Sequence, residues 1–259
     1  VGERPEDGRE EHHGEVRLDP GASFTTVPAA LVAAAGGNTR DAAFSALTRL
    51  RRVLRAPRTA DAALPVVYND YMNTLMGQPS TEALRPLIDA AARAGAEVFC
   101  IDAGWFTDST DYWSAVGAWE DAPTRFTGGL GGVIAEIRAS GMRPGLWLEP
   151  ESVGLDSPVA ETLPDEAFFR RHGVAVVQQR RKHLDLRHPA ARAHLDAVVD
   201  RIVAEHGIEY IKLDYNIEPG SGTDVGGLAP GHGLLEHTRA LRTWLVDIQA
   251  RHPQLLIEN

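Results

Sequence analysis

Residues 64–259 alternate between short apolar runs and longer amphipathic stretches. The short runs have the length of buried strands and end in polar or acidic residues, whereas the longer stretches repeat apolar residues at helical spacing. Strands are predicted at 64–70, 97–105, 143–151, 207–216 and 254–259, and helices at 80–95, 130–141, 189–207 and 233–252. Strands that alternate with helices indicate an α/β fold, with parallel strands joined by right-handed crossovers.

The residues before this alternation follow two other patterns. Residues 1–19 are rich in Glu, Arg, Gly and His without apolar periodicity, which predicts a mobile, charged tail. Residues 20–60 hold a short extended piece and then an amphipathic helix at 41–55. The predicted organisation is therefore a tail, a connecting segment at 20–60 and one large domain at 61–259.

Acidic residues stand at the carboxyl ends of the predicted strands. They are Asp70, Asp102, Glu149, Glu151, Asp214 and Glu258. Any one of them alone would be interpreted as a cap of the following loop, but in a (β/α)8 barrel all these ends meet at one mouth that holds the active site. An open dinucleotide-binding sheet would need a glycine-rich loop directly after its first strand, and none follows 64–70. The pattern favours a (β/α)8 TIM barrel, of which this chain holds about the first five β/α units.

Charge and composition narrow the range of partners. The formal net charge of −10 opposes binding to nucleic acid and anionic membranes, so a neutral small molecule is the expected partner. No apolar run approaches the roughly 20 residues that span a bilayer, and the N-terminus is too charged for an export signal. Cys100 is the single cysteine, which excludes an intramolecular disulfide and is typical of a reducing cytoplasm.

The histidines do not form a recognisable metal-binding motif, and we predict no metal site. Their spacings suit neither a helical nor a loop ligand set at His183, His188, His194 and His206. Tryptophans accompany the acids instead, with Trp105 and Trp147 close to strand ends. A pyranose ring offers an apolar C–H face to an aromatic ring and hydroxyl groups to carboxylates. Acids and tryptophans at one mouth therefore indicate a carbohydrate site that needs no cofactor.

Residues 207–216 carry the strongest chemical signal. Alternate positions of this predicted strand place Lys212, Asp214 and Asn216 on one face. Glycoside hydrolysis needs an ionised carboxylate as nucleophile or base, and a second, protonated carboxyl group as acid. Asp214 is the best nucleophile candidate, because the charge of Lys212 should lower its pKa. A Schiff-base role for Lys212 is the weaker alternative, since it requires a desolvated and unpaired amine.

The chain contains FCIDAGW, GLWLEPE, HLDLRHP and YIKLDYN in this order. Together these motifs resemble the catalytic barrel of glycoside hydrolase family 36, the α-galactosidases of the melibiase clan. The resemblance implies a β-sandwich followed by a (β/α)8 barrel. It also implies hydrolysis of terminal α-galactosides such as melibiose and raffinose with retention of configuration, by two aspartates and without a cofactor. Oligomers are common in the family, so a homo-oligomer is a further expectation.

The resemblance also implies roles for individual residues. Asp214 would be the nucleophile. The resemblance assigns hydroxyl contacts to Lys212 and Asp102 and the lining of the sugar pocket to Trp147. Asn69 and Asn216 are expected to border the pocket from their own places at strand ends. A turn role is the alternative for Asn69, and the sugar-binding arginine of the family falls at Arg180 or Arg181 without a choice between them.

The sequence departs from the family pattern in three places. Many members have two adjacent aspartates where this chain has Asp102 followed by Ala103, which removes one expected hydroxyl contact. The acid/base aspartate would fall beyond Asn259, and only the last strand of the β-sandwich, at 15–26, is expected here. Two hypotheses follow: a retaining α-galactosidase whose other part lies outside this sequence, or an inactive or sugar-binding remnant that lacks the general acid.

Overall fold

Five parallel strands form the sheet that organises residues 64–259. In the computed structural model they are β1 (Val67–Asn69), β2 (Val98–Ile101), β3 (Arg143–Leu148), β9 (Tyr210–Leu213) and β10 (Leu256–Glu258). They lie side by side in chain order, and every neighbouring pair is parallel. A doubly wound sheet reverses its strand order at a switch point, whereas chain-order neighbours are the arrangement of a (β/α)8 barrel. The predicted parallel sheet is confirmed, and it is consistent with part of such a barrel.

The structure describes residues 14–35, 38–55, 64–227 and 229–259. They fall into two compact units, one within 17–63 and the other formed by 64–259 together with 14–16. Most of the predicted charged tail, at 1–13, lies outside the described residues, as does the predicted domain border between residues 60 and 61.

In the unit within 17–63, helix α1 (Thr39–Leu54) is the predicted amphipathic helix. The Asn38 side chain caps it by accepting a hydrogen bond from the amide of Asp41, and none of the helical residues is buried. Residues 14–35 contain a turn but neither helix nor strand. The sandwich strand expected at 15–26 is therefore not found in this stretch, and an extended segment without neighbouring strands has nothing to pair with.

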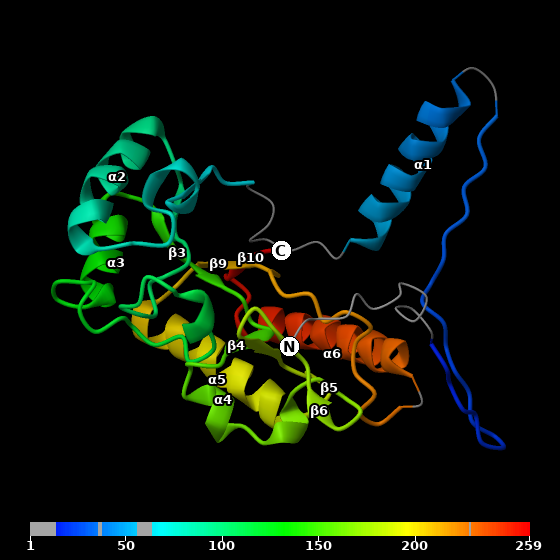
Figure 1. The fold of residues 1–259 in the computed structure, drawn as a ribbon. Coiled ribbons are helices and arrows are strands. Elements are labelled where there is room, and N and C mark those ends of the chain that lie inside the picture. The colour runs from blue at the N-terminus through cyan, green and yellow to red at the C-terminus, as the bar shows by residue number, and fades with distance from the viewer. Residues whose placement is uncertain (1–13, 36–37, 56–63, 228) are drawn as a thin grey trace. The chain divides into compact units, whose positions relative to one another are not determined.

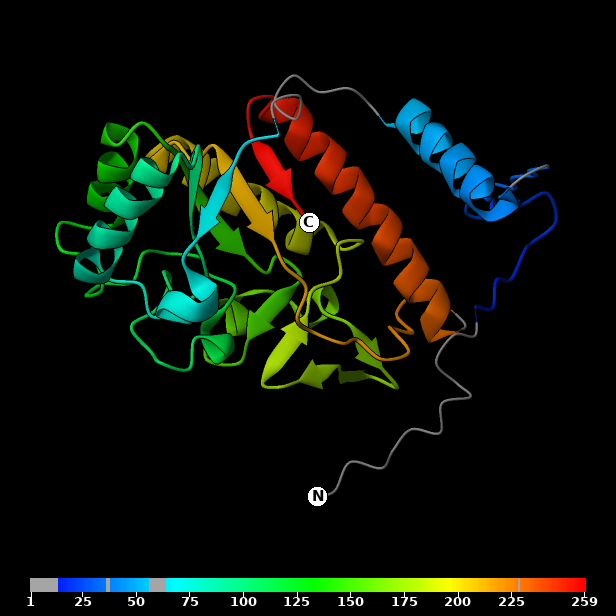
Figure 2. The same cartoon turned by 90° about the horizontal axis from the view of Figure 1, so that it is seen from above.

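Four longer helices connect the parallel strands. They are α2 (Thr81–Ala94), α3 (Leu130–Ala139), α5 (Pro189–His206) and α6 (Pro230–Arg251). Contacts run from α2 to α3, from α3 to β3 and α5, and from α5 to α6, so the helices follow one another along the outside of the sheet (Figures 1 and 2). Both ends of α2 are capped, because Ser80 Oγ accepts a hydrogen bond from the Ala83 amide at 3.3 Å and Gly95 ends the helix at φ +84°. None of the helices in the described residues combines the length and hydropathy that a bilayer span requires.

Tryptophans fill the space between the sheet and its loops. Trp105, Trp119 and Trp147 are each at most 1% exposed. The ring of Trp119 lies 6.3 Å from that of Trp105 and 5.9 Å from that of Trp147, between centroids. The Trp105 indole N–H donates to the Trp147 carbonyl at 2.9 Å. This packing joins the loop after β2 to the end of β3.

Gly104 makes the turn after β2 possible. It has φ of +93°, and a Cβ there would stand 2.1 Å from the Gly77 carbonyl oxygen. Only glycine combines this backbone conformation with so close an approach. The turn brings the loop that follows β1 against the end of β2, where Cys100 is fully buried.

Residues 152–187, between β3 and α5, form an excursion that the sequence pattern did not predict. Its elements are β4 (Ser152–Gly154), α4 (Val159–Thr162), the short turn η3 (Asp165–Ala167), β5 (Arg170–Arg171), β6 (Val174–Ala175), β7 (Val177–Gln178) and β8 (Arg181–His183). Strands β4, β8 and β7 form an antiparallel sheet, and β5 pairs with β6. Elements of two to four residues are too short to show a hydrophobic period. The excursion lies towards the carboxyl ends of the parallel strands (Figure 2). Two short turns, η1 (Tyr71–Leu75) and η2 (Trp113–Ala115), follow β1 and β2.

Candidate active site

Asp214 directly follows β9, at the carboxyl end of the sheet. Its backbone amide continues the pairing with β3 by donating to the Leu148 carbonyl at 2.8 Å. One carboxylate oxygen, Oδ2, accepts a hydrogen bond from the Trp147 indole N–H at 3.0 Å, and Oδ1 accepts one from the Tyr215 amide at 3.0 Å. The carboxylate is thus fixed by Trp147 of β3 and by the backbone just after β9, while its side chain stays partly exposed.

The environment of Asp214 favours the ionised form. Partial burial is the largest single influence and raises the pKa, but hydrogen bonds from Asn216, Trp147 and the Tyr215 amide, together with the charge of Lys212, lower it below its usual value. The predicted direction is therefore confirmed. The predicted cause was incomplete, because the hydrogen bonds lower the pKa of Asp214 more than Lys212 does.

Lys212 forms an ion pair that joins three strands. Its ammonium group lies 3.1 Å from Asp102 Oδ2, at the end of β2, and the Asn69 amide of β1 donates to the same oxygen at 2.5 Å. Burial opposes the charge of Lys212, but Asp102 and Asp214 raise its pKa above the ordinary lysine value. A paired, charged lysine is unsuited to Schiff-base chemistry, so the weaker alternative is not supported.

Asp70 stands behind this ion pair and is almost fully buried. Its Oδ1 accepts a hydrogen bond from the Asp102 amide at 2.7 Å, whereas its Oδ2 has no partner. Burial raises the pKa of Asp70 to about 7; the hydrogen bond from Asp102 lowers the pKa, and the Asp102 charge raises it further. The two acids at the ends of β1 and β2 therefore differ, because Asp102 is paired with a cation whereas Asp70 is partly protonated at neutral pH.

Trp147 touches the site through its polar edge. The ring is 1% exposed because Phe106, Trp113 and Trp119 pack around it, with centroids 5.9–6.3 Å away. Its indole N–H orients Asp214, and in this arrangement the ring face is covered by other aromatic rings. The expected role of Trp147 in lining a sugar pocket stays a prediction.

A cavity of about 660 Å³ opens beside Tyr215 and Asn216, the two residues that follow Asp214 in the chain. It is lined by Trp113, Gln179, Arg181, Tyr215, Asn216, Ile217 and Glu218. Asn216 holds this wall in place, because its backbone N–H donates to Glu149 Oε1 at 2.6 Å and its backbone carbonyl accepts from Arg181 at 2.7 Å. The sequence-predicted Asn216 therefore borders this cavity, whereas Asn69 donates a hydrogen bond to Asp102, the partner of Lys212.

The structure distinguishes between the two adjacent arginines. Arg181 is buried, lies 2.7 Å from Glu149 in an ion pair and stands 4.9 Å from the centroid of the Trp113 ring. Burial is the main influence on Glu149 and raises its pKa, against the lowering effect of Arg181. Arg180 instead pairs with Asp156 at the surface, where both side chains are more than half exposed. Arg181 is the arginine of the cavity wall.

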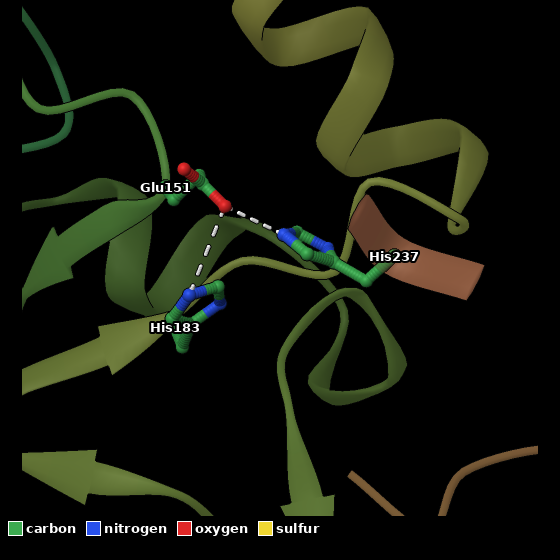
Figure 3. Close-up of side chains that lie close together, drawn as sticks. All are labelled: Glu151, His183 and His237. Carbon is green, nitrogen blue, oxygen red and sulfur yellow. Dashed lines mark hydrogen bonds and ion pairs between the residues drawn. The ribbon is translucent and has the colours of Figure 1, made fainter. Parts of the chain in front are cut away.

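Two of the strand-end acids point elsewhere. The Glu258 carboxylate of β10 accepts a hydrogen bond from the Tyr210 hydroxyl. Glu151 lies in a buried cluster with His183 of β8 and His237 of α6 (Figure 3). The spacing of His183 to other histidines gave no sign of this cluster, and no local pattern distinguishes His237 from the other polar residues of its helix.

The buried cluster of Glu151, His183 and His237 has the residue types of a metal centre. Their ligand atoms lie within 4.8 Å of one another. However, His237 Nε2 is 2.6 Å from Glu151 Oε1, and His237 Nδ1 accepts a hydrogen bond from the Leu186 amide at 3.1 Å. A backbone amide only donates, so neutral His237 carries its proton on Nε2, where a metal would bind. The arrangement fits a hydrogen-bonded network better than a metal site.

Comparison with known proteins identifies similar chains. A family model described as Melibiase matches residues 23–258. Alpha-galactosidase 1 from Pediococcus pentosaceus is 30% identical over 247 residues, a match that covers 94% of this chain and 33% of that protein. The chain thus spans about a third of the length of the curated relatives it matches.

Solved structures share the fold. The galactosidase domain of the alpha-galactosidase–sucrose kinase AgaSK, from Mediterraneibacter gnavus, superposes with a TM-score of 0.64 at 25% identity and covers 74% of this chain and 26% of that one. TtGalA, an alpha-galactosidase from Thermus thermophilus solved in complex with stachyose, gives a TM-score of 0.61 at 26% identity, with 80% of this chain and 42% of that one covered. Part of a TIM-type barrel accounts for both matches.

Proposed function

This chain belongs to the melibiase family, as its four motifs predicted, and from this premise we propose that it forms the nucleophile-bearing part of a retaining α-galactosidase. The observation that carries the proposal is the carboxylate of Asp214, which stands at the carboxyl end of β9 and is kept ionised by Trp147, Asn216 and Lys212. The proposed substrates are oligosaccharides with a terminal α-galactosyl residue, such as melibiose and raffinose.

In the proposed reaction, Asp214 attacks the anomeric carbon of the galactosyl residue. The bond from this carbon to the leaving-group oxygen breaks, this oxygen takes a proton from a second carboxyl group or leaves as the aryloxide of an activated substrate, and a covalent galactosyl-enzyme forms. Water then attacks the same carbon, gives up a proton to that second group or to solvent, and releases Asp214. Its lowered pKa suits this role, since only the ionised carboxylate is a nucleophile and a good leaving group.

The remaining predicted site residues supply binding and orientation. Lys212 and Asp102 form a charged pair with Asn69 in which donors and acceptors are available to sugar hydroxyls. Asn216 and Arg181 border the cavity beside Tyr215, and Trp147 orients the nucleophile. We propose no cofactor, a neutral oligosaccharide as the only small-molecule partner, a cytoplasmic location and a capacity to form homo-oligomers, by analogy with the family.

A second candidate function is sugar binding without hydrolysis. Retaining hydrolysis needs a second carboxyl group as acid. Among the described residues, the carboxyl groups that act on Lys212 or Asp214 are engaged or buried. Asp102 pairs with Lys212, Glu149 pairs with Arg181, and Asp70 is covered. This observation favours testing the nucleophile half-reaction by itself.

Hydrolysis of p-nitrophenyl α-galactoside separates the two functions, because its leaving group needs little protonation. We expect turnover by the 259-residue chain that falls at least about 10³-fold in Asp214→Ala. Asp89→Ala, at an exposed position of α2, is the matched control and should keep full activity. Nuclear magnetic resonance of the first-formed galactose should show the α-anomer. Galactose binding without turnover would instead support the binding function, and a β-anomer product would refute retention.

A further inference from the structure

We propose that His183 is a positioning residue, which holds the Tyr215 hydroxyl so that the Tyr215 amide stays directed at Asp214 and the Tyr215 ring stays in the cavity wall. This inference deepens the proposed function and rests on Asp214 as the nucleophile. It assigns a purpose to the buried cluster around Glu151 (Figure 3).

The hydrogen bonds of His183 define its tautomer. Its Nδ1 lies 2.8 Å from the Leu184 carbonyl, which can only accept, so Nδ1 carries the proton. The ring is completely buried, and this burial is the main influence that lowers its pKa to about 4, so the imidazole is neutral at pH 7. Its Nε2 therefore offers one lone pair, and the Tyr215 hydroxyl donates to it at 3.1 Å.

The imidazole of His183 is held rigidly. The Phe169 ring stacks on it at 4.1 Å between centroids, and the His237 ring meets it edge-on at 5.0 Å. His237 is itself fixed, because it accepts from the Leu186 amide and donates to Glu151. The lone pair of His183 thus points in a direction that packing and hydrogen bonds both determine.

Tyr215 links this rigid cluster to the reacting carboxylate. Its amide donates to Asp214 Oδ1 at 3.0 Å, and its side chain, 45% exposed, lines the cavity. Residues 214–219 have no regular secondary structure, so no ladder of backbone hydrogen bonds fixes the orientation of this amide. Two contacts supply that restraint: the Tyr215 hydroxyl is held by His183, and the backbone amide of the next residue, Asn216, is held by Glu149.

The first test is a double-mutant cycle of His183→Leu and Tyr215→Phe, measured on the 259-residue chain. Both variants remove the same hydrogen bond, so each should lower kcat for p-nitrophenyl α-galactoside by about tenfold, and the double variant should be no slower than either single one. His183→Gln, whose side-chain oxygen can accept near the position of Nε2, should recover most of the activity. Multiplied effects in the double variant, or unchanged kcat in Tyr215→Phe, would overturn the proposal.

The acidic limb of the pH profile of kcat/KM distinguishes a positioning role of His183 from a role in folding stability alone. Loss of the aligned Tyr215 amide should move this limb to higher pH, because that amide lowers the pKa of Asp214. The other groups that face Asp214, namely Lys212, Trp147 and Asn216, are unchanged in these variants, and Glu151, Asp185 and His237 face His183 throughout. Val198→Ala, at a buried position of α5, should lower stability without moving the acidic limb of the pH profile. A limb that moves equally in Val198→Ala would refute the role.

Two further readouts keep this inference separate from the proposed function. The coupling of His183 with Tyr215 is also measurable in urea unfolding, which needs no turnover. If the chain shows no galactosidase activity but His183 and Tyr215 are still coupled in urea unfolding, the proposed function is rejected and the contact between the two residues is retained. Stoichiometric zinc binding that His183→Leu abolishes would overturn the proposal, since one lone pair cannot serve a metal ion and Tyr215 together.

Discussion

The ends of the parallel strands and the excursion of residues 152–187 contribute different kinds of side chain to the surroundings of Asp214. The strand ends supply the partly accessible Asp214 and Lys212, together with the buried Asp102 that pairs with Lys212. The excursion supplies Arg181 and His183, both at most 1% exposed and each held by several partners. Reactive charge comes from the regular part of the fold, and the restraint that directs it comes from the irregular part. Substitutions at the strand ends and in the excursion should therefore have different effects.

The largest expected effect is on stability, in the excursion. Arg181→Met removes one partner of a buried ion pair and leaves Glu149, which is completely buried, without its cation. We expect the free energy of unfolding to fall by about 3–5 kcal/mol, measured by urea denaturation at pH 7. Arg180→Met is the matched control at the neighbouring position and should change stability little, because its ion pair is exposed. Equal losses in the two variants would contradict the assignment of Arg181 as the structural arginine.

Next in size is the pH dependence of stability that Asp70 imposes at the strand ends. Its folded pKa of about 7 lies above the ordinary value of 3.8, so the folded state binds more protons than the unfolded state between these limits. Stability therefore decreases as pH rises from about 4 to 7, by an amount on the order of 3 kcal/mol. Asp70→Asn should remove this decrease and raise stability relative to wild type at pH 8. Identical pH profiles for the two proteins would exclude a raised pKa.

Lys212→Met changes the charged groups at the strand ends, and its effect is measured on catalysis. The change leaves Asp102 without its ammonium partner and removes one of the groups that lower the pKa of Asp214. We expect kcat/KM for an aryl α-galactoside to fall about 10²-fold. Because Asp214 must be ionised, its raised pKa should also shift the acidic limb of the profile to higher pH. A pure KM effect with an unmoved limb would restrict Lys212 to sugar binding.

The smallest expected effect concerns acid stability in the excursion. His183 is neutral when folded, with a pKa of about 4 instead of 6.5, so the unfolded state binds more protons between these values. This contribution to stability is present above pH 6.5 and is lost as pH falls towards 4, by an amount on the order of 2 kcal/mol. His183→Gln should flatten that acid decline, as followed by thermal melts from pH 4 to 7. An unaltered decline would assign acid sensitivity to other groups.

The sequence predicted the strand ends well and the excursion hardly at all. Lys212 and Asp214 are predicted because side chains alternate between the two faces of a strand, and Asp102 is predicted because it directly follows a buried apolar run. Both signals lie within a few neighbouring residues of the sequence. The choice of Arg181 over Arg180 depends on pairing between β4 and β8, and Arg180 has φ of +60°, which no local pattern indicates. His237, on α6, lies more than 50 residues after the end of β8, so only the tertiary fold brings it to Glu151.

The chain-order arrangement of the sheet has a consequence for synthesis on the ribosome. Each parallel strand pairs with the one made just before it, so every new strand can add to an edge that already exists. The excursion is made before β9 and α6, yet His183 finds Tyr215 and His237 only after those later elements emerge. The scaffold of the pocket thus grows in steps, while the alignment of its nucleophile is a late event that waits for α6.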